Sequence, residues 1–122
     1  MTIVYDTLTG MTKRFCKRLG YPMIDINEYD QQPVEGEIIL VTRSIHFGLV
    51  TEMTEAFLYK HYHQVVGVAV SGNRNWCELY GAAGDKISRA FNIPLICKFE
   101  GSGFPNDVRL VKEYIEERIN AA

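Results

Sequence analysis

Two short, uninterrupted runs of small and aliphatic residues, at 38–41 and 65–70, constrain the fold of this chain most. A strand without polar residues has no face suited to water, so it is typically buried on both sides in a parallel sheet. Apolar residues recur at helical spacing in 52–61, 78–91 and 107–119, which separate or follow these runs. Strands that alternate with helices form right-handed βαβ units. The pattern therefore predicts an α/β protein with helices on both faces of its sheet.

Further segments complete the predicted sheet. Residues 3–5, 23–26 and 95–99 are expected strands, and residues 13–19 are an expected helix. Five strands in this arrangement fit a flavodoxin-like, doubly wound five-stranded parallel sheet with strand order 2-1-3-4-5. A chain of 122 residues has the length of one domain, so we expect residues 1–122 to form a single domain. The core-facing residues of the helices are expected to include Met53, Phe57, Leu79, Ile87, Val108 and Ile119.

Composition argues against several classes of protein. A formal net charge of −2 leaves no basic surplus for general nucleic-acid binding. The N-terminus has no basic segment followed by a long apolar stretch, and no apolar run could span a bilayer, so we expect no membrane partner. Cys16, Cys77 and Cys97 are odd in number and form no zinc-binding pattern, so we expect no metal site. Unpaired cysteines fit a reducing, cytoplasmic location.

The segment 7–12, Thr-Leu-Thr-Gly-Met-Thr, lies between the first expected strand and the helix that follows it. Backbone N–H groups in a first helical turn have no intrahelical acceptor and can bind an anion. Gly10 lets the backbone approach a ligand closely, and Thr7, Thr9 and Thr12 carry hydroxyl donors. The segment matches neither the phosphate loop of nucleoside triphosphatases nor the glycine pattern of dinucleotide sites. It therefore indicates either a monophosphate site or an ordinary polar turn.

Polar loops are expected after the third and fourth strands, at residues 42–51 and 71–77. In a doubly wound sheet both loops lie at the carboxyl edge beside segment 7–12, where ligands bind. The second loop holds the only tryptophan, Trp76. An indole among amide groups is suited to a planar ligand that also forms hydrogen bonds. The alternative is that Trp76 covers the end of the sheet while neighbouring asparagines satisfy the turn backbone.

The second loop also carries a family resemblance. The run Ser-Gly-Asn-Arg-Asn-Trp at 71–76 resembles the NrdI family, whose members are small flavodoxin-like proteins that serve class Ib ribonucleotide reductases. The resemblance covers essentially the whole chain, and this run is its most specific part. The other matching residues are Thr9-Gly10, Lys13-Arg14-Phe15, Phe47-Gly48, Tyr80-Gly81, Asp85-Lys86-Ile87-Ser88, Pro94, Lys98-Phe99-Glu100, Ser102-Gly103 and Asn106-Asp107-Val108.

The resemblance implies a protein that binds FMN non-covalently and acts as a redox accessory protein without an organic substrate of its own. Its reduced flavin would react with O2, and the resulting superoxide or peroxide would reach the dimanganese centre of the radical-generating subunit of the reductase. A separate partner would reduce the flavin. The residues that the resemblance places around the cofactor are Thr7, Leu8, Thr9, Gly10, Met11, Thr12, Arg43, Ser44, Ile45, His46, Phe47, Gly48, Ser71, Gly72, Asn73, Asn75, Trp76 and Cys77.

By position, segment 7–12 would hold the FMN phosphate. Residues 44–48 would flank one side of the isoalloxazine, and residues 73–77 would flank the other, with Trp76 near the ring. Two alternative functions stay open beside this one. A general flavodoxin-type electron carrier would have a strongly acidic surface around the flavin, and a flavin-free member of the same fold would be a binding or regulatory module.

The chain departs from the family pattern at Met11, His46 and Cys77, and the family usually has glycine at the last two positions. A residue other than glycine costs free energy where the backbone adopts a positive φ. Arg43 and Arg74, together with His46, bring positive charge to the expected site. Such charge would favour an anionic reduced flavin.

Overall fold

The sheet carries five parallel strands in the order β2-β1-β3-β5-β6. The structure, a computed structural model, describes residues 1–46 and 48–121. Taken in chain order, these five strands confirm the predicted flavodoxin-like order 2-1-3-4-5. Their bounds are Thr2–Tyr5 for β1, Met23–Asp25 for β2, Ile38–Ile45 for β3, Val65–Gly72 for β5 and Leu95–Glu100 for β6. A further strand, β4 (Leu49–Val50), pairs antiparallel with the end of β3.

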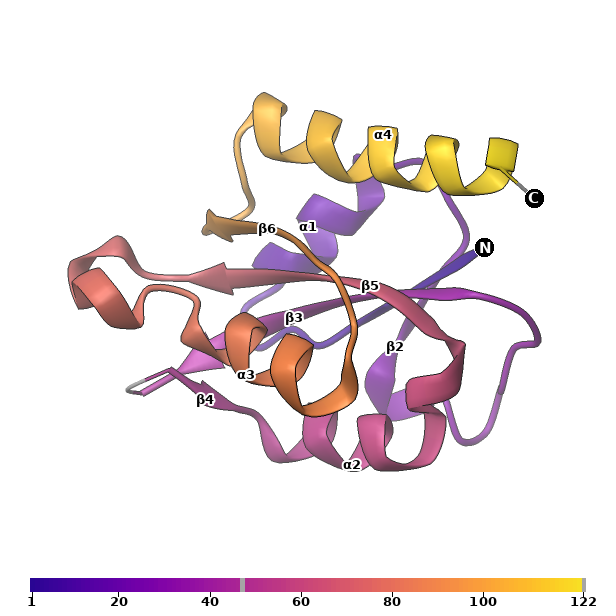
Figure 1. Ribbon diagram of the computed structural model, residues 1–122, viewed down its shortest axis with the longest axis horizontal. Coiled ribbons are helices and arrows are strands. Elements are labelled where there is room, and N and C mark those ends of the chain that lie inside the picture. The colour runs from indigo at the N-terminus through magenta and orange to yellow at the C-terminus, as the bar shows by residue number, and fades with distance from the viewer. Residues whose placement is uncertain (47, 122) are drawn as a thin grey trace.

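Helices cover both faces of the sheet (Figure 1). Helices α1 (Met11–Lys17) and α4 (Pro105–Ala121) lie on one face, and α2 (Glu52–His61) and α3 (Ala82–Phe91) lie on the other. Within residues 1–46 and 48–121, three short 3-10 helices connect the elements: η1 (Ile26–Glu28), η2 (Tyr62–Gln64) and η3 (Arg74–Leu79).

The apolar run of β3 contributes side chains to two hydrophobic clusters, one on each face of the sheet. Its side chains alternate between the faces of the sheet. Ile39 and Val41 pack into the cluster under α1 and α4, whereas Ile38 and Leu40 pack into the cluster under α2 and α3. All four are fully buried. The continuous apolar run predicted by the sequence therefore reflects burial on both faces.

The structure corrects both predicted polar loops. The segment 42–51 is not one long loop, because β3 continues to Ile45 and turns into β4. Strand β5 likewise extends through Ser71 and Gly72, which pair with Phe99 and Glu100 of β6. Polar residues at the open end of a central strand resemble a loop in sequence, but neighbouring strands supply their backbone hydrogen bonds.

The helix predictions were correct in position: residues 52–61 have the same bounds as α2, and the other three helices differ from the prediction at their ends. Helix α3 begins at Ala82 instead of residue 78, because Cys77 and Gly81 adopt positive φ before it. The predicted core residues Phe57, Ile87 and Val108 are buried. The predictions for Met53, Leu79 and Ile119 were wrong, since each is at least 40% exposed.

Over residues 1–46 and 48–121, none of the helices combines the length and apolar character needed to cross a bilayer.

Candidate functional site

Three polar segments meet at the carboxyl edge of the sheet. They follow β1, β3 and β5, which are parallel neighbours, so their ends point the same way. We call them the β1–α1 turn (residues 7–12), the hairpin (residues 43–50) and the tryptophan loop (residues 73–80). All three lie in the left half of Figure 1, the hairpin and the tryptophan loop at its far left and the β1–α1 turn nearer the middle. The topology thus places every segment that the sequence analysis singled out at one edge.

The β1–α1 turn is open toward solvent. Gly10 adopts a φ of +89°, and a Cβ at this position would meet no atom within 4 Å. The Thr7 hydroxyl accepts a hydrogen bond of 2.9 Å from the Gly10 amide, which leaves the hydroxyl proton of Thr7 available. Within the described chain, the amides of Leu8 and Thr9 donate to none of the protein's acceptors. The turn therefore presents unpaired donors at an unobstructed surface, as an anion site requires.

Thr12 has a different task from the other threonines of this turn. Its side chain is buried, and its hydroxyl donates a 2.7 Å hydrogen bond to the backbone carbonyl of Asp6. This bond closes the turn between the end of β1 and the first turn of α1. Thr12 therefore shapes the β1–α1 turn, while Thr7 and Thr9 keep hydroxyl donors for a ligand.

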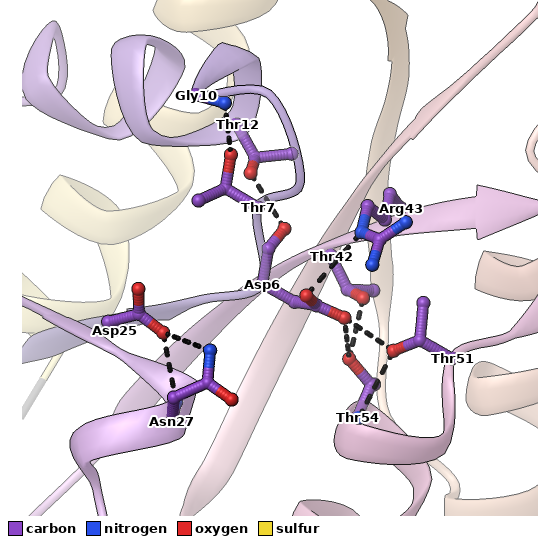
Figure 2. A network of polar contacts seen from close by, with 10 residues as sticks. All are labelled: Asp6, Thr7, Gly10, Thr12, Asp25, Asn27, Thr42, Arg43, Thr51 and Thr54. Atoms are coloured by element: carbon purple, nitrogen blue, oxygen red, sulfur yellow. Dashed lines mark hydrogen bonds and ion pairs between the residues drawn. The ribbon is translucent and has the colours of Figure 1, made fainter.

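A buried carboxylate lies beneath the turn (Figure 2). The Asp6 side chain accepts hydrogen bonds from the hydroxyls of Thr51 and Thr54 and from Nε of Arg43, the last at 3.4 Å. The Thr54 hydroxyl, 2.7 Å from that of Thr42, accepts from Thr42 when it donates to Asp6. Burying a carboxylate costs free energy unless hydrogen bonds or an opposite charge compensate it, and Asp6 has both.

The hairpin packs against the start of α3. Ser44 and Ile45 of β3 pair with Val50 and Leu49 of β4, and the Ser44 hydroxyl accepts a 3.4 Å hydrogen bond from the amide of Ala83. Gly48 is buried at φ +84°, and a Cβ there would lie 2.6 Å from the Cβ of Ala82. Only glycine permits this close approach.

The tip of the hairpin includes two positions from the predicted site. His46 is exposed and adopts a φ of 48°. Its backbone therefore has the positive φ that the sequence analysis identified as costly for a residue other than glycine. Phe47, the other predicted residue here, lies outside the described residues.

The tryptophan loop is held by contacts at its base. The Asn73 side chain accepts a 2.9 Å hydrogen bond from the Asn75 amide. The Arg74 amide donates to Glu100, and its guanidinium forms an ion pair of 3.2 Å with the same carboxylate and lies over the ring of Tyr80. Trp76 is 44% exposed, so part of its surface can contact a ligand or partner.

One residue of this loop has a strained backbone. Cys77 adopts φ 51° and ψ −113°, a combination that side-chain-bearing residues rarely occupy. Gly81 then turns the chain into α3 at φ 60°, where a Cβ would lie 2.7 Å from the Lys98 side chain. Residues held in such conformations cost about 1–3 kcal/mol and often lie at functional sites. Cys77, like His46, thus adopts a positive φ although it carries a side chain.

Both arginines of the expected site are paired with carboxylates. Arg43 bonds to Asp6, and Arg74 bonds to Glu100. Arg43 is the more enclosed, with 26% of its side chain exposed against 63% for Arg74. Their positive charges at this edge are therefore partly offset.

Sequence reasoning missed the acidic and hydroxyl residues that organise the site. Asp6 follows a buried strand directly, and an acidic residue in that position is a signal that could have been used. Thr51 precedes α2 and caps it by accepting a 3.2 Å hydrogen bond from the Thr54 amide, which fits the usual start signal of a helix. Glu100 carries no such signal, because it ends β6 while its partner Arg74 lies in the loop that follows β5.

The three thiols differ in burial. Burial raises the pKa of the Cys97 thiol to about 12 and raises that of Cys16 further. Cys77, in contrast, is exposed. In the described part of the chain, three or more His, Cys, Asp or Glu side chains do not gather anywhere in a way that could hold a metal ion.

Solved structures share this architecture. A short-chain flavodoxin associated with a bacterial microcompartment superposes with a TM-score of 0.78 at 18% identity, covering 99% of this chain and 97% of that one. A flavodoxin of Fusobacterium nucleatum bound to flavin mononucleotide gives a TM-score of 0.65 at 14% identity, covering 98% and 96%. At such low identity the likeness establishes the flavodoxin-like fold alone.

Sequence relatives define the family more narrowly. Residues 3–113 match the family described as NrdI flavodoxin-like. The SPbeta prophage-derived protein NrdI of Bacillus subtilis is 39% identical over 116 residues, which cover 93% of this chain and 90% of that protein. Protein NrdI of Macrococcus caseolyticus is 40% identical over 120 residues, covering 96% and 90%. The chain therefore belongs to the NrdI family of flavodoxin-like proteins.

Proposed function

We propose that this chain binds FMN at the carboxyl edge of its sheet and serves as a redox accessory protein of a class Ib ribonucleotide reductase. One observation carries the proposal: in a chain of the NrdI family, an open turn with unpaired amides lies at the same sheet edge as two loops that could flank a planar ring. A flavodoxin bound to flavin mononucleotide shares this fold.

The β1–α1 turn would hold the FMN phosphate. The amides of Leu8 and Thr9 and the hydroxyls of Thr7 and Thr9 are the available donors, and the open space at Gly10 lets the phosphate approach the backbone. The Met11 side chain cannot donate a hydrogen bond, so only its backbone amide would contribute. The donor set is uncharged and therefore suits one phosphate without a bound metal ion.

The hairpin and the tryptophan loop would flank the flavin ring. Ser44, Ile45, His46 and Gly48 lie in the first, and Asn73, Asn75, Trp76 and Cys77 lie in the second. Bound FMN, once reduced by a separate partner, would supply the electrons that reduce O2 to superoxide or peroxide, the oxidant for the dimanganese centre of the radical-generating subunit. The protein's part is to bind and orient the ring and to shape the path between it and the partner.

An apolar rim supports the docking of a partner protein at this edge. Exposed apolar side chains occur on each of the edge segments, and side chains of this kind would suit the surface of a protein partner. Such a rim could exclude water around the path of the oxidant once the reductase subunit is bound. Its members, each at least 40% exposed, are Leu8, Met11, Leu49, Trp76, Leu79 and Phe104.

Cofactor binding is tested first. We expect the purified protein to bind FMN more tightly than riboflavin, because the phosphate meets the β1–α1 turn. Thr9→Glu, which places a carboxylate in this turn, should weaken FMN binding at least about tenfold while changing riboflavin binding little, since like charges repel. Equal loss for both flavins would show that the phosphate is held elsewhere, and no binding of any flavin would favour the flavin-free module.

The accessory role is tested with the partner. The fully reduced protein is mixed with O2 and the manganese-loaded radical-generating subunit from the same source, and the oxidised cofactor is measured by electron paramagnetic resonance. We expect more oxidised cofactor than free reduced FMN produces at the same concentration, and a smaller yield with Thr9→Glu. A yield no higher than that of free reduced FMN would exclude the proposed role and favour a general electron carrier.

A further inference from the structure

The hairpin is attached to the rest of the site at both of its ends by one side chain. Arg43 begins the hairpin, and Thr51 follows its last residue. The Asp6 carboxylate accepts from Nε of Arg43 through one oxygen and from the Thr51 hydroxyl through the other. The two residues that border the hairpin are thus joined through a carboxylate that belongs to neither of its strands.

The same residue also supports the β1–α1 turn. The Asp6 amide donates a 2.9 Å hydrogen bond to the carbonyl of Val41 in β3, and its carbonyl accepts from the hydroxyl of Thr12. The Asp6 carboxylate is 4% exposed. Its hydrogen bonds to Arg43 and Thr51 are therefore shielded from bulk water, and a hydrogen bond to a charged group is stronger in such surroundings. Asp6 therefore connects the turn that would hold a phosphate to the hairpin that would flank a ring (Figure 2).

Strand geometry explains why Arg43 reaches this carboxylate. Side chains alternate along β3, so Thr42 points toward α2, where it bonds to Thr54, and Arg43 points to the face of Val41 and α1. The β1–α1 turn precedes α1 on that face. Asp6 directly follows the last residue of β1. Its carboxylate therefore lies between Arg43, near the end of β3, and Thr51, which precedes α2.

We propose that Asp6 and Arg43 form a clamp that positions the hairpin relative to the β1–α1 turn, with Thr51 as its second attachment. Asp6 and Arg43 are positioning residues in this proposal. In the protein without ligand, the clamp keeps β4 paired with the end of β3. The consequence for flavin binding rests on the proposed function. The clamp would hold the hairpin against the flavin ring, so it would strengthen binding of the ring and not of the phosphate.

The first test needs no ligand. Arg43→Gln removes the charge at a partly exposed position, so the variant is expected to fold, and Arg109→Gln removes an arginine from an exposed ion pair on α4 as the matched control. Backbone hydrogen exchange of the apoprotein is measured at Ser44, Ile45, Leu49 and Val50. We expect exchange about tenfold faster in Arg43→Gln, as the loss of one ionic hydrogen bond implies, and no change in the control.

The buried partner is tested in the same way. Asp6→Asn keeps the shape of the side chain but cannot accept from Arg43 as an anion, so it should raise exchange in the hairpin at least as much as Arg43→Gln does. Arg43→Lys keeps the cation and should restore at least half of the protection on a logarithmic scale. Hairpin exchange in Arg43→Gln that equals the control would overturn the clamp.

The second test uses the two flavins as probes. We expect Arg43→Gln to weaken FMN and riboflavin by the same factor, about tenfold, and to shift the visible absorption spectrum of bound FMN. Arg43→Lys should return both affinities toward those of the unaltered protein. A loss confined to FMN would show that Arg43 contacts the phosphate instead, which contradicts the proposal. If the protein binds no flavin, the proposed function fails, while the exchange measurement still decides whether the clamp exists.

Discussion

Replacing Gly48 with alanine tests how the hairpin is seated on α3. A Cβ at Gly48 would lie 2.6 Å from the Cβ of Ala82 and 3.4 Å from the carbonyl oxygen of Leu79. Relieving the first contact requires the hairpin or the first turn of α3 to shift, which typically costs about 1–3 kcal/mol in a packed interior. The φ of +84° adds about 1–2 kcal/mol for a residue with a side chain.

A matched control separates these two contributions. Gly36 has a φ of +89°, and a Cβ there would meet no atom within 4 Å. Gly36→Ala should therefore show the backbone contribution alone, reduced by about 0.4–1 kcal/mol because alanine restricts the unfolded chain. We expect a loss of about 1 kcal/mol for Gly36→Ala and about 2–4 kcal/mol for Gly48→Ala.

The assay is equilibrium unfolding in urea, followed by far-ultraviolet circular dichroism. The double variant with Ala82→Gly removes the atom that the new Cβ would strike. It should recover most of the difference between Gly48→Ala and Gly36→Ala, as positive coupling in a double-mutant cycle. Equal destabilisation by Gly48→Ala and Gly36→Ala, or the absence of coupling to Ala82, would refute the proposed seating of the hairpin on α3.

Four further outcomes are expected. FMN added to the apoprotein should quench most of the Trp76 emission, and unchanged emission at saturation would place the indole away from the flavin. Cys77→Gly should raise the free energy of unfolding by about 1 kcal/mol, because relief of a strained φ and ψ outweighs the greater freedom of the unfolded chain; a loss of stability in urea would contradict this. At pH 8 a disulfide reagent should titrate one thiol, Cys77, because Cys16 is buried, Cys97 is partly buried, and the pKa values of both are raised. The raised pKa of Cys97 also means that its contribution to stability is complete below its ordinary value of 9.0 and is lost as pH rises toward about 12. Unfolding free energies that stay constant from pH 9 to pH 11 would contradict that reasoning.

Much of the site could be predicted because its segments follow strands. Once the five strands were placed, the carboxyl ends of β1, β3 and β5 had to meet at one edge. The lengths of β3 and β5 were underestimated because residues such as Thr42 and Ser71 are polar, and only pairing with neighbouring strands keeps them extended. The contact of Arg74 with Glu100 joins segments 26 residues apart, which no local pattern indicates.

The sequence by itself determined the class of fold, the segments at the carboxyl edge and the family. Those features depend on local apolar periodicity and on short runs such as residues 71–76, which can be recognised without knowing what they touch. Only the tertiary structure decided which partners these segments have. Asp6 looks like an ordinary polar residue at the end of a strand, and it becomes a link between three elements because β1, β3 and α2 bring Arg43 and Thr51 to it. The physical reason is that a buried carboxylate must find donors within hydrogen-bonding distance, and packing alone selects which residues provide them.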